Sequence, residues 1–277
     1  MFEKMNGVWY TEKRFLMDMK EIIGKVDHTL LSPTATENEI ITACTDAIEY
    51  HAASVCIPPC YVRLAKSLCG EEQKITTVAG FPNGYNSEAS KMTEIDRALR
   101  DGADEIDFVM NVALFKSGKK ELVLNELKRA RQETEGKILK VIIECCNLTE
   151  EEKIRATEIV ALSGADYIKT STGFMKGGAT LYDIGIIKRA KPESLKIKAA
   201  GGIRDFDTAR AMLLAGADRL GASALIKLIK EKEKNNGLNS SFQRRYNTRV
   251  FRYAYARRSD EIKVYRRGLF TGRGNVQ

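Results

Sequence analysis

Residues 166–174 read Asp166-Tyr167-Ile168-Lys169-Thr170-Ser171-Thr172-Gly173-Phe174. Tyr167 and Ile168 follow a Gly-Ala-Asp turn and predict a strand, and the hydroxyl and glycine residues after them predict its end. Lys169 lies at the end of this apolar strand, where a buried ammonium is costly unless it loses its proton or gains a partner. Lys169 is therefore either an edge-strand lysine that points to water or a residue with a chemical role.

The stretch belongs to a repeating pattern in which short apolar segments alternate with amphipathic ones. The predicted strands are 26–31, 53–57, 75–79, 105–109, 139–144, 167–170, 197–200 and 219–221. A helix is expected after each strand, the first of them from a capping box that starts at Thr36. Buried parallel strands show this pattern, and eight βα units are the number that closes a barrel. An open doubly wound sheet is the alternative, but no G-x-G-x-x-G follows the first strand.

We therefore predict an α/β fold, a (β/α)8 TIM barrel over residues 25–234. A short N-terminal extension or helix is expected at 1–24 and a basic tail at 235–277. This tail carries ten basic and two acidic residues, which accounts for the whole net charge of +8. It lacks periodicity and is expected to be disordered. Nucleic-acid binding by its arginine and aromatic side chains is the less favoured alternative.

Composition excludes several other classes of protein. No run of about 18 apolar residues predicts a transmembrane helix, and charged residues interrupt the first 20 residues, which argues against a signal peptide. The six cysteines form no C-x-x-C pair and only two histidines are present, so a metal site is not expected. Free thiols are typical of the cytoplasm, which is the expected location.

Three charged residues are predicted to enter the barrel from different strands. Period-two alternation directs Asp107, Lys169 and Lys198 inward, near the C-terminal ends where barrel active sites lie. Two ammonium groups about 6 Å apart repel by roughly 2.8 kcal/mol at an effective dielectric constant of about 20. Such repulsion lowers one amine's pKa by about two pH units and makes it a carbonyl nucleophile, with Asp107 placed to shuttle protons. The alternative is a salt-bridge cluster that only stabilises the barrel.

The loops after the seventh and eighth predicted strands have the composition of a phosphate site. They read Ala200-Gly201-Gly202-Ile203-Arg204 and Gly221-Ala222-Ser223. Glycine lets backbone N–H groups approach an anion, Ser223 starts a helix whose dipole favours negative charge, and Arg204 adds positive charge. Cys56 ends the second strand and is expected to border the cavity, as a small buried apolar residue rather than a catalytic thiol.

Seven segments, taken in order, resemble the deoxyribose-phosphate aldolases, a family of class I (Schiff-base) aldolases. They are residues 26–30 (VDHTL), 53–56 (ASVC), 79–82 (AGFP), 105–107 (EID), 167–174 (YIKTSTGF), 198–204 (KAAGGIR) and 221–224 (GASA). The resemblance extends over about residues 25–229. Phe174 stands where some members have a lysine, and the tail from Asn235 replaces the region in which some members place a tyrosine near the site.

The resemblance implies that Lys169 forms an imine with the substrate, that Lys198 tunes it and transfers protons, and that Asp107 is the acid/base partner. It assigns the sugar end of the site to Asp27, Thr29, Cys56 and Thr170, and the phosphate to Gly201, Gly202, Gly221 and Ser223. The implied reaction is reversible cleavage of 2-deoxy-D-ribose 5-phosphate to acetaldehyde and D-glyceraldehyde 3-phosphate. No cofactor or metal is implied, because the protonated imine is the electron sink.

Two further expectations concern partners and the alternative activity. The expected partner is a small phosphosugar substrate, with no membrane and with a homodimer or homotetramer as the assembly. Another phosphosugar-binding barrel enzyme, an isomerase or a transaldolase-like enzyme, is the alternative function. That alternative predicts turnover without release of acetaldehyde.

Overall fold

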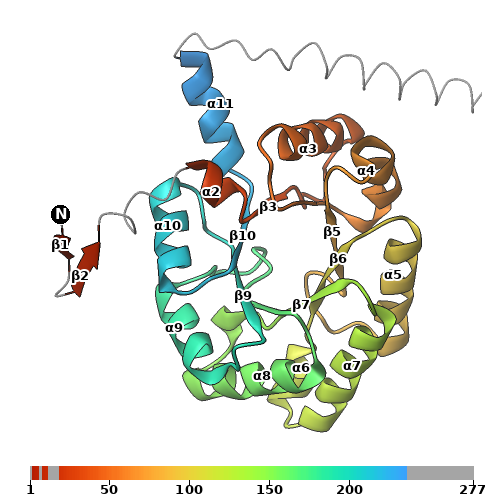
Figure 1. The fold of residues 1–277 in the computed structure, drawn as a ribbon. Coiled ribbons are helices and arrows are strands. Elements are labelled where there is room, and N and C mark those ends of the chain that lie inside the picture. Colours follow the sequence, from red (N-terminus) through yellow and green to blue (C-terminus); the bar gives the residue numbers. More distant parts are fainter. Residues whose placement is uncertain (1, 6–7, 12–18, 236–277) are drawn as a thin grey trace, which may run out of the picture. The chain divides into compact units, whose positions relative to one another are not determined.

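The computed structural model describes residues 2–5, 8–11 and 19–235, and its main element is a closed barrel of eight parallel strands. The ring order is β10-β3-β4-β5-β6-β7-β8-β9. The strands are β3 (Val26–Thr29), β4 (Ser54–Cys56), β5 (Ile75–Ala79), β6 (Glu105–Val109), β7 (Ile138–Ile142), β8 (Tyr167–Lys169), β9 (Lys196–Ala200) and β10 (Arg219–Ala222). Figure 1 looks into the ring, with the helices outside it. The predicted TIM barrel is confirmed.

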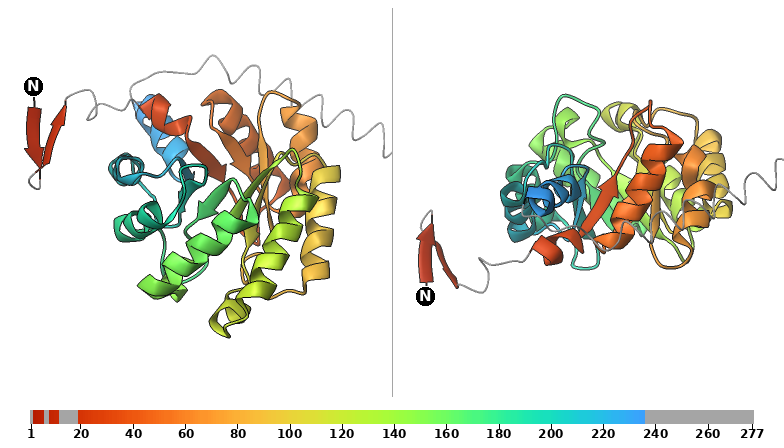
Figure 2. Two further views of the ribbon diagram at one scale, coloured as in Figure 1. Left: turned by 60° about the horizontal axis from the view of Figure 1, so that its bottom comes forward. Right: turned by 90° about the horizontal axis from the view of Figure 1, so that it is seen from above.

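Helices alternate with the strands and cover the outside of the ring, as Figure 2 shows from two further sides. They are α2 (Met19–Ile23), α3 (Glu37–Glu49), α4 (Val62–Cys69), α5 (Glu88–Arg100), α6 (Val112–Lys116), α7 (Lys120–Glu133), α8 (Glu150–Ser163), α9 (Leu181–Ala190), α10 (Phe206–Ala215) and α11 (Leu225–Asn235), with 3-10 turns η1 (Pro59–Tyr61) and η2 (Cys145–Asn147). Within the described ranges, the search for a helix of membrane-spanning length and apolarity finds none.

Two described segments were not predicted. Near the N-terminus, β1 (Phe2–Met5) and β2 (Val8–Thr11) pair as an antiparallel hairpin where only an extension or a short helix was expected. After β6, the short helix α6 precedes α7, so two helices follow this strand where one was expected. The predicted tail at 235–277 lies, except for its first residue, outside the described residues.

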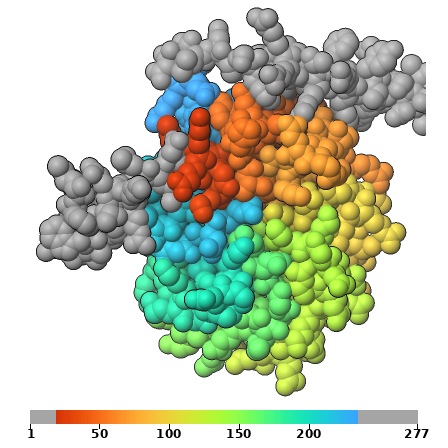
Figure 3. All heavy atoms as spheres, viewed as in Figure 1, coloured from red at the N-terminus to blue at the C-terminus, as the bar shows by residue number. Residues whose placement is uncertain are grey.

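The first and last βα units close the ring. β10 pairs with β3, so that Gly221 lies opposite Asp27, and α2 packs on α10. Figure 3 shows the corresponding red and orange atoms directly against the cyan and blue ones. This closure brings side chains from the two ends of the barrel sequence into one interior.

The strand register decides which charged residues meet inside the barrel. Lys169 lies opposite Lys198 across β8 and β9, and Asp107 lies opposite Lys140 across β6 and β7. All four side chains are at most 3% exposed. On the other face of β6, Phe108 packs under the ammonium of Lys91 from α5. The barrel interior is therefore charged, and the apolar core lies between the strands and the helices.

The helix caps that the sequence predicts are present. Thr36 accepts a hydrogen bond from the backbone N–H of Glu39, whose carboxylate accepts one from the N–H of Thr36 in return. The Thr36→Ala variant is expected to lose about 1 kcal/mol of unfolding free energy, because the first turn of α3 loses a partner. Denaturant unfolding measures this loss.

Thr42→Ala is the matched control, since Thr42 lies inside the same helix, is exposed, and donates only to the carbonyl of Asn38. Equal losses of unfolding free energy in the two variants would contradict the capping explanation.

Candidate active site

A cavity of about 360 Å³ lies at the C-terminal ends of β3, β8, β9 and β10. Seven of the predicted site residues line it: Thr29, Lys169, Gly201, Gly202, Arg204, Gly221 and Ser223. Both glycine-containing loops that were expected to hold phosphate therefore contribute to the lining of this cavity. The volume falls in the range of small-molecule sites.

Lys169 connects this cavity with the barrel interior. Its side chain is 3% exposed, and Nζ lies 2.8 Å from Oδ2 of Asp107. Burial lowers the pKa of Lys169, the carboxylate of Asp107 opposes this, and the ammonium of Lys198 lowers the pKa further. The direction of this pKa shift agrees with the expectation from the sequence, but its largest cause is desolvation and not repulsion between the two amines.

The pKa of Lys198 shifts in the opposite direction, although this residue lies beside Lys169. Its Nζ is 2.6 Å from Oδ2 of Asp107 and 2.5 Å from Oδ2 of Asp27. Burial disfavours its ammonium, but the two carboxylates outweigh burial and raise its pKa. Burial likewise opposes ionisation of Asp107, yet the three surrounding lysines hold its pKa well below the usual range. The site thus combines an amine whose pKa is lowered with an ammonium and a carboxylate whose charged forms are favoured.

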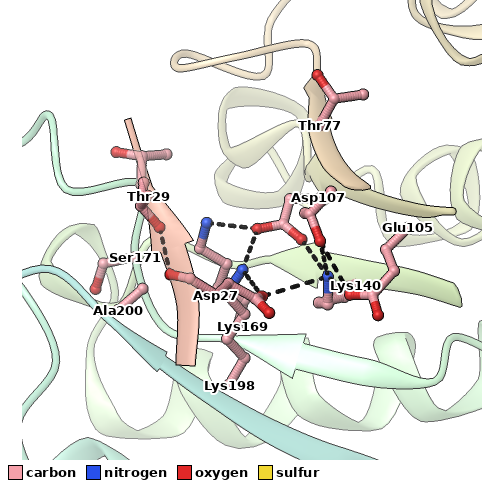
Figure 4. Close-up of polar contacts among 12 residues, drawn as sticks. Asp27, Thr29, Thr77, Glu105, Asp107, Lys140, Lys169, Ser171, Lys198 and Ala200 are labelled. Atoms are coloured by element: carbon pink, nitrogen blue, oxygen red, sulfur yellow. Dashed lines mark hydrogen bonds and ion pairs between the residues drawn. The ribbon is translucent and has the colours of Figure 1, made fainter. Parts of the chain in front are cut away.

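Further charged residues, which the sequence argument missed, extend this arrangement into the barrel (Figure 4). Lys140 contacts Oε2 of Glu105 at 2.5 Å and Oδ1 of Asp107 at 3.0 Å. Arg219 contacts Oδ1 of Asp27 at 2.7 Å. We call the following set the buried charge cluster: Asp27, Glu105, Asp107, Lys140, Lys169, Lys198 and Arg219. The sequence signal for Lys140 was the one used for Lys169, a lysine between apolar residues of a strand.

Three of the residues expected at the sugar end do not line the cavity. Asp27 is fully buried in the charge cluster. Thr170 uses its hydroxyl to bind both the carbonyl and the N–H of Ala200, and so joins the ends of β8 and β9. Cys56 is fully buried, and burial raises the pKa of its thiol to about 11, which keeps it neutral. Their side chains are already occupied by the protein.

A buried carboxylate that the sequence argument also missed holds the loop after β8. Glu144 accepts hydrogen bonds from the N–H of Thr172 at 3.1 Å and from its hydroxyl at 2.5 Å. Thr172 and Phe174 both line the cavity. Glu144 has a backbone φ of 54°, in the left-handed region that is unfavourable for residues other than glycine. Such strained backbone conformations are concentrated at functional sites.

Close backbone packing between two loops also shapes the cavity. A Cβ on Gly178 would lie 2.3 Å from the carbonyl oxygen of Gly201. Gly178→Ala therefore pushes the loop after β8 away from the loop after β9. We expect KM to rise about 10- to 100-fold, the equivalent of about 1–3 kcal/mol of overpacking. Steady-state kinetics measures this change.

Gly24→Ala is the control for this prediction, because a Cβ on Gly24 would meet no atom closer than 3.5 Å. A KM for Gly178→Ala that equals the KM of the Gly24→Ala variant would show that the two loops can separate without affecting the cavity.

Comparison with known proteins shows which family the chain belongs to. The family model described as DeoC/LacD family aldolase matches residues 21–239. A deoxyribose-phosphate aldolase of Clostridium botulinum is 46% identical over 217 residues, which cover 78% of this chain and 98% of that protein. A relative of the same name from Streptococcus pyogenes is 45% identical over 216 residues, 78% of this chain and 97% of the relative.

Solved structures of aldolases are also similar to this chain. An aldolase named QR15 is 40% identical, with a TM-score of 0.74 over 79% of this chain and 99% of its own. A deoxyribose-phosphate aldolase from Aeropyrum pernix is 27% identical, with a TM-score of 0.74 over 80% of this chain and 96% of its own. The chain therefore belongs to the DeoC/LacD family of aldolases and is a carbon–carbon lyase.

Proposed function

We propose that this aldolase cleaves 2-deoxy-D-ribose 5-phosphate reversibly to acetaldehyde and D-glyceraldehyde 3-phosphate, through an imine on Lys169. The observation that supports this most is a buried lysine with a lowered pKa at the wall of a cavity, in contact with the Asp107 carboxylate. A neutral amine is the form that attacks a carbonyl. The names of the relatives supply the substrate.

Formation of the protonated imine moves one proton from the amine nitrogen to the carbonyl oxygen and takes up a second proton. Nζ of Lys169 attacks C1 of the open-chain sugar, and the resulting carbinolamine loses water. Oδ2 of Asp107 contacts both Lys169 and Lys198, at 2.8 Å and 2.6 Å. This oxygen accepts the proton that the attacking amine releases and passes it to the former carbonyl oxygen, which becomes the hydroxyl of the carbinolamine. The Lys198 ammonium donates the second proton, with which that hydroxyl leaves as water.

Cleavage then uses the protonated imine as an electron sink. The C3 hydroxyl gives its proton to the Asp107–Lys198 pair, the C2–C3 bond breaks, and its electron pair forms the enamine. D-Glyceraldehyde 3-phosphate leaves. Protonation of C2 and addition of water release acetaldehyde and restore the free amine of Lys169.

We assign the phosphate to the loops after β9 and β10. Gly201 and Gly202 have φ values of 85° and 79°, in the left-handed region that glycine adopts without steric cost, and the lack of side chains lets an anion approach their backbone N–H groups. Ser223 precedes α11, and Arg204 adds a cation to the lining. Binding the phosphate here leaves the aldehyde end free to reach Lys169.

Trapping tests the proposal directly. Borohydride reduction in the presence of acetaldehyde should add a two-carbon mass to the peptide that contains Lys169. An enzyme-coupled assay should detect acetaldehyde during turnover of the phosphosugar. Turnover without acetaldehyde would instead identify an isomerase or a transaldolase-like enzyme, and adduct formation that persists in Lys169→Ala would exclude Lys169 as the nucleophile.

Assembly and location are part of the proposal. The Aeropyrum pernix structure is described as a tetramer, and we propose a homodimer or homotetramer here. Sedimentation equilibrium decides this, and a monomer at assay concentration would refute it. We also propose a cytoplasmic location, which the six free cysteines favour.

A further inference from the structure

The buried charge cluster holds more positive than negative groups. Four of its side chains are cationic (Lys140, Lys169, Lys198 and Arg219) and three are acidic (Asp27, Glu105 and Asp107). With every group ionised, one positive charge has no counter-charge in a nearly solvent-free interior, which is unfavourable. Loss of a single proton from one lysine balances the cluster.

The contacts indicate which lysine loses that proton. Lys140 lies within 3.5 Å of three carboxylates, and Lys198 lies within 2.6 Å of two. Arg219 contacts two carboxylates as well and does not deprotonate in proteins. Among the described residues, the ion pairs of Lys169 reduce to one, with an Asp107 oxygen that Lys198 also binds. Lys169 is therefore the least compensated cation.

We propose that Lys140, which does not line the cavity, is a positioning residue whose fixed charge, acting through Asp107, makes Lys169 the lysine that gives up its proton. This inference rests on the proposed function, in which Lys169 is the nucleophile. Nothing in the imine mechanism itself uses Lys140, Glu105 or Arg219.

The path from Lys140 to Lys169 runs across one carboxylate. Oδ1 of Asp107 binds Lys140 at 3.0 Å, and Oδ2 binds Lys169 at 2.8 Å. Without Lys140, three cations would face three carboxylates, and Asp107 would have one ammonium fewer to neutralise it. Lys169 would then keep its proton as the counter-ion of Asp107.

The charge of Lys140 is itself fixed at neutral pH. Burial opposes its ammonium, but Asp107, Asp27 and Glu105 outweigh burial and raise its pKa. The groups that face it are Asp27 from β3, Thr76 from β5, Glu105 and Asp107 from β6, Tyr167 from β8, Lys198 from β9 and, through Glu105, Arg219 from β10. The groups that face Lys169 are Asp107, Lys198 and the neutral thiol of Cys56.

The experiment measures the protonation of Lys169 without relying on turnover. Acetic anhydride acylates neutral amines only, and mass spectrometry of the Lys169 peptide gives its acylation rate at each pH. In Lys140→Met, the midpoint of this profile should move up by about one pH unit or more, so that the rate falls about ten-fold below the midpoint and recovers in alkali. Glu105→Gln, which removes an anion, should move the midpoint down.

The double variant Lys140→Met/Glu105→Gln separates charge from packing. It has the wild-type excess of one positive charge, so its midpoint should return toward the wild-type value. A merely structural role would instead lower the rate equally at every pH and make the double variant worse than either single one. Lys91→Met is the matched control, because Lys91 is fully buried and paired with Glu126 at 3.0 Å outside the cluster, and its loss should leave the midpoint unchanged.

The midpoints of the acylation profiles decide whether Lys140 governs the proton of Lys169. Midpoints that do not move in Lys140→Met and Glu105→Gln overturn the inference. If Lys140→Met does not fold, Glu105→Gln decides alone by the direction of its shift. Absence of a borohydride adduct or of acetaldehyde in the wild type would refute the proposed function, while the acylation profiles would still show whether Lys140 governs the proton of Lys169.

Discussion

The Lys169→Met variant is expected to lose at least about 10⁴-fold in kcat/KM for the proposed substrate, 2-deoxy-D-ribose 5-phosphate, because it removes the amine that forms the imine. Lys140 and Lys198 remain as ammonium ions, held by two or more carboxylates each. Both also lie outside the cavity lining, so neither replaces Lys169 as the nucleophile. The loss should appear in the coupled acetaldehyde assay and as disappearance of the borohydride adduct.

The same variant should fold at least as well as the wild type. Methionine has about the volume of the lysine side chain, and the substitution removes the one amine whose ammonium form the cluster does not compensate. Three cations then face three carboxylates, so the unfolding free energy should stay level or rise. Loss of activity with unchanged stability is the expected signature of a residue kept for chemistry.

Lys188→Met provides the control for this substitution. Lys188 is exposed on α9 and donates only to the carbonyl of Ala215, at 3.4 Å. The kcat/KM of the Lys188→Met variant should match that of the wild type. A Lys169→Met enzyme that retains more than about one hundredth of wild-type activity would show that the amine is not the nucleophile.

The barrel could be predicted from the sequence because its signals are local. Helix caps such as Thr36, and glycines that close helices such as Gly164 with its φ of 80°, lie within a few residues of the boundaries they set. Strand alternation needs only neighbouring residues. The same alternation predicted that Asp107, Lys169 and Lys198 share the interior, where Asp107 contacts both lysines.

The rest of the site depends on register between strands that are far apart in the sequence. Whether Asp27 faces the cavity or the cluster is decided by its position opposite Gly221 and Ser54. The contact of Glu144 with Thr172 depends on a left-handed backbone conformation that no local signal predicts for glutamate. Lys140, in contrast, was predictable, because it is an inward-facing lysine on a predicted strand.

Asp107→Asn is expected to lower the unfolding free energy by about 3–5 kcal/mol at neutral pH, since it leaves buried ammonium ions without their shared partner. Three lysines contact Asp107, which is fully buried. Because its pKa is held below 3.8, its contribution is fully present at neutral pH and is lost as pH falls below that value. The stability difference between wild type and variant should therefore narrow in acid.

The Asp107→Asn substitution should also lower the activity, for a reason that is separate from the loss of stability. An amide does not accept the proton that the attacking amine releases, so kcat should drop by about 10²- to 10⁴-fold even in the folded fraction. Asp207→Asn is the matched control: the same chemical change on a side chain that is 92% exposed and paired only with Arg210 should alter unfolding by less than about 0.5 kcal/mol. If Asp107→Asn unfolds with the same free energy as Asp207→Asn, Lys140 and Lys198 are not ammonium ions that depend on this carboxylate, and the electrostatic basis of the proposed mechanism is wrong.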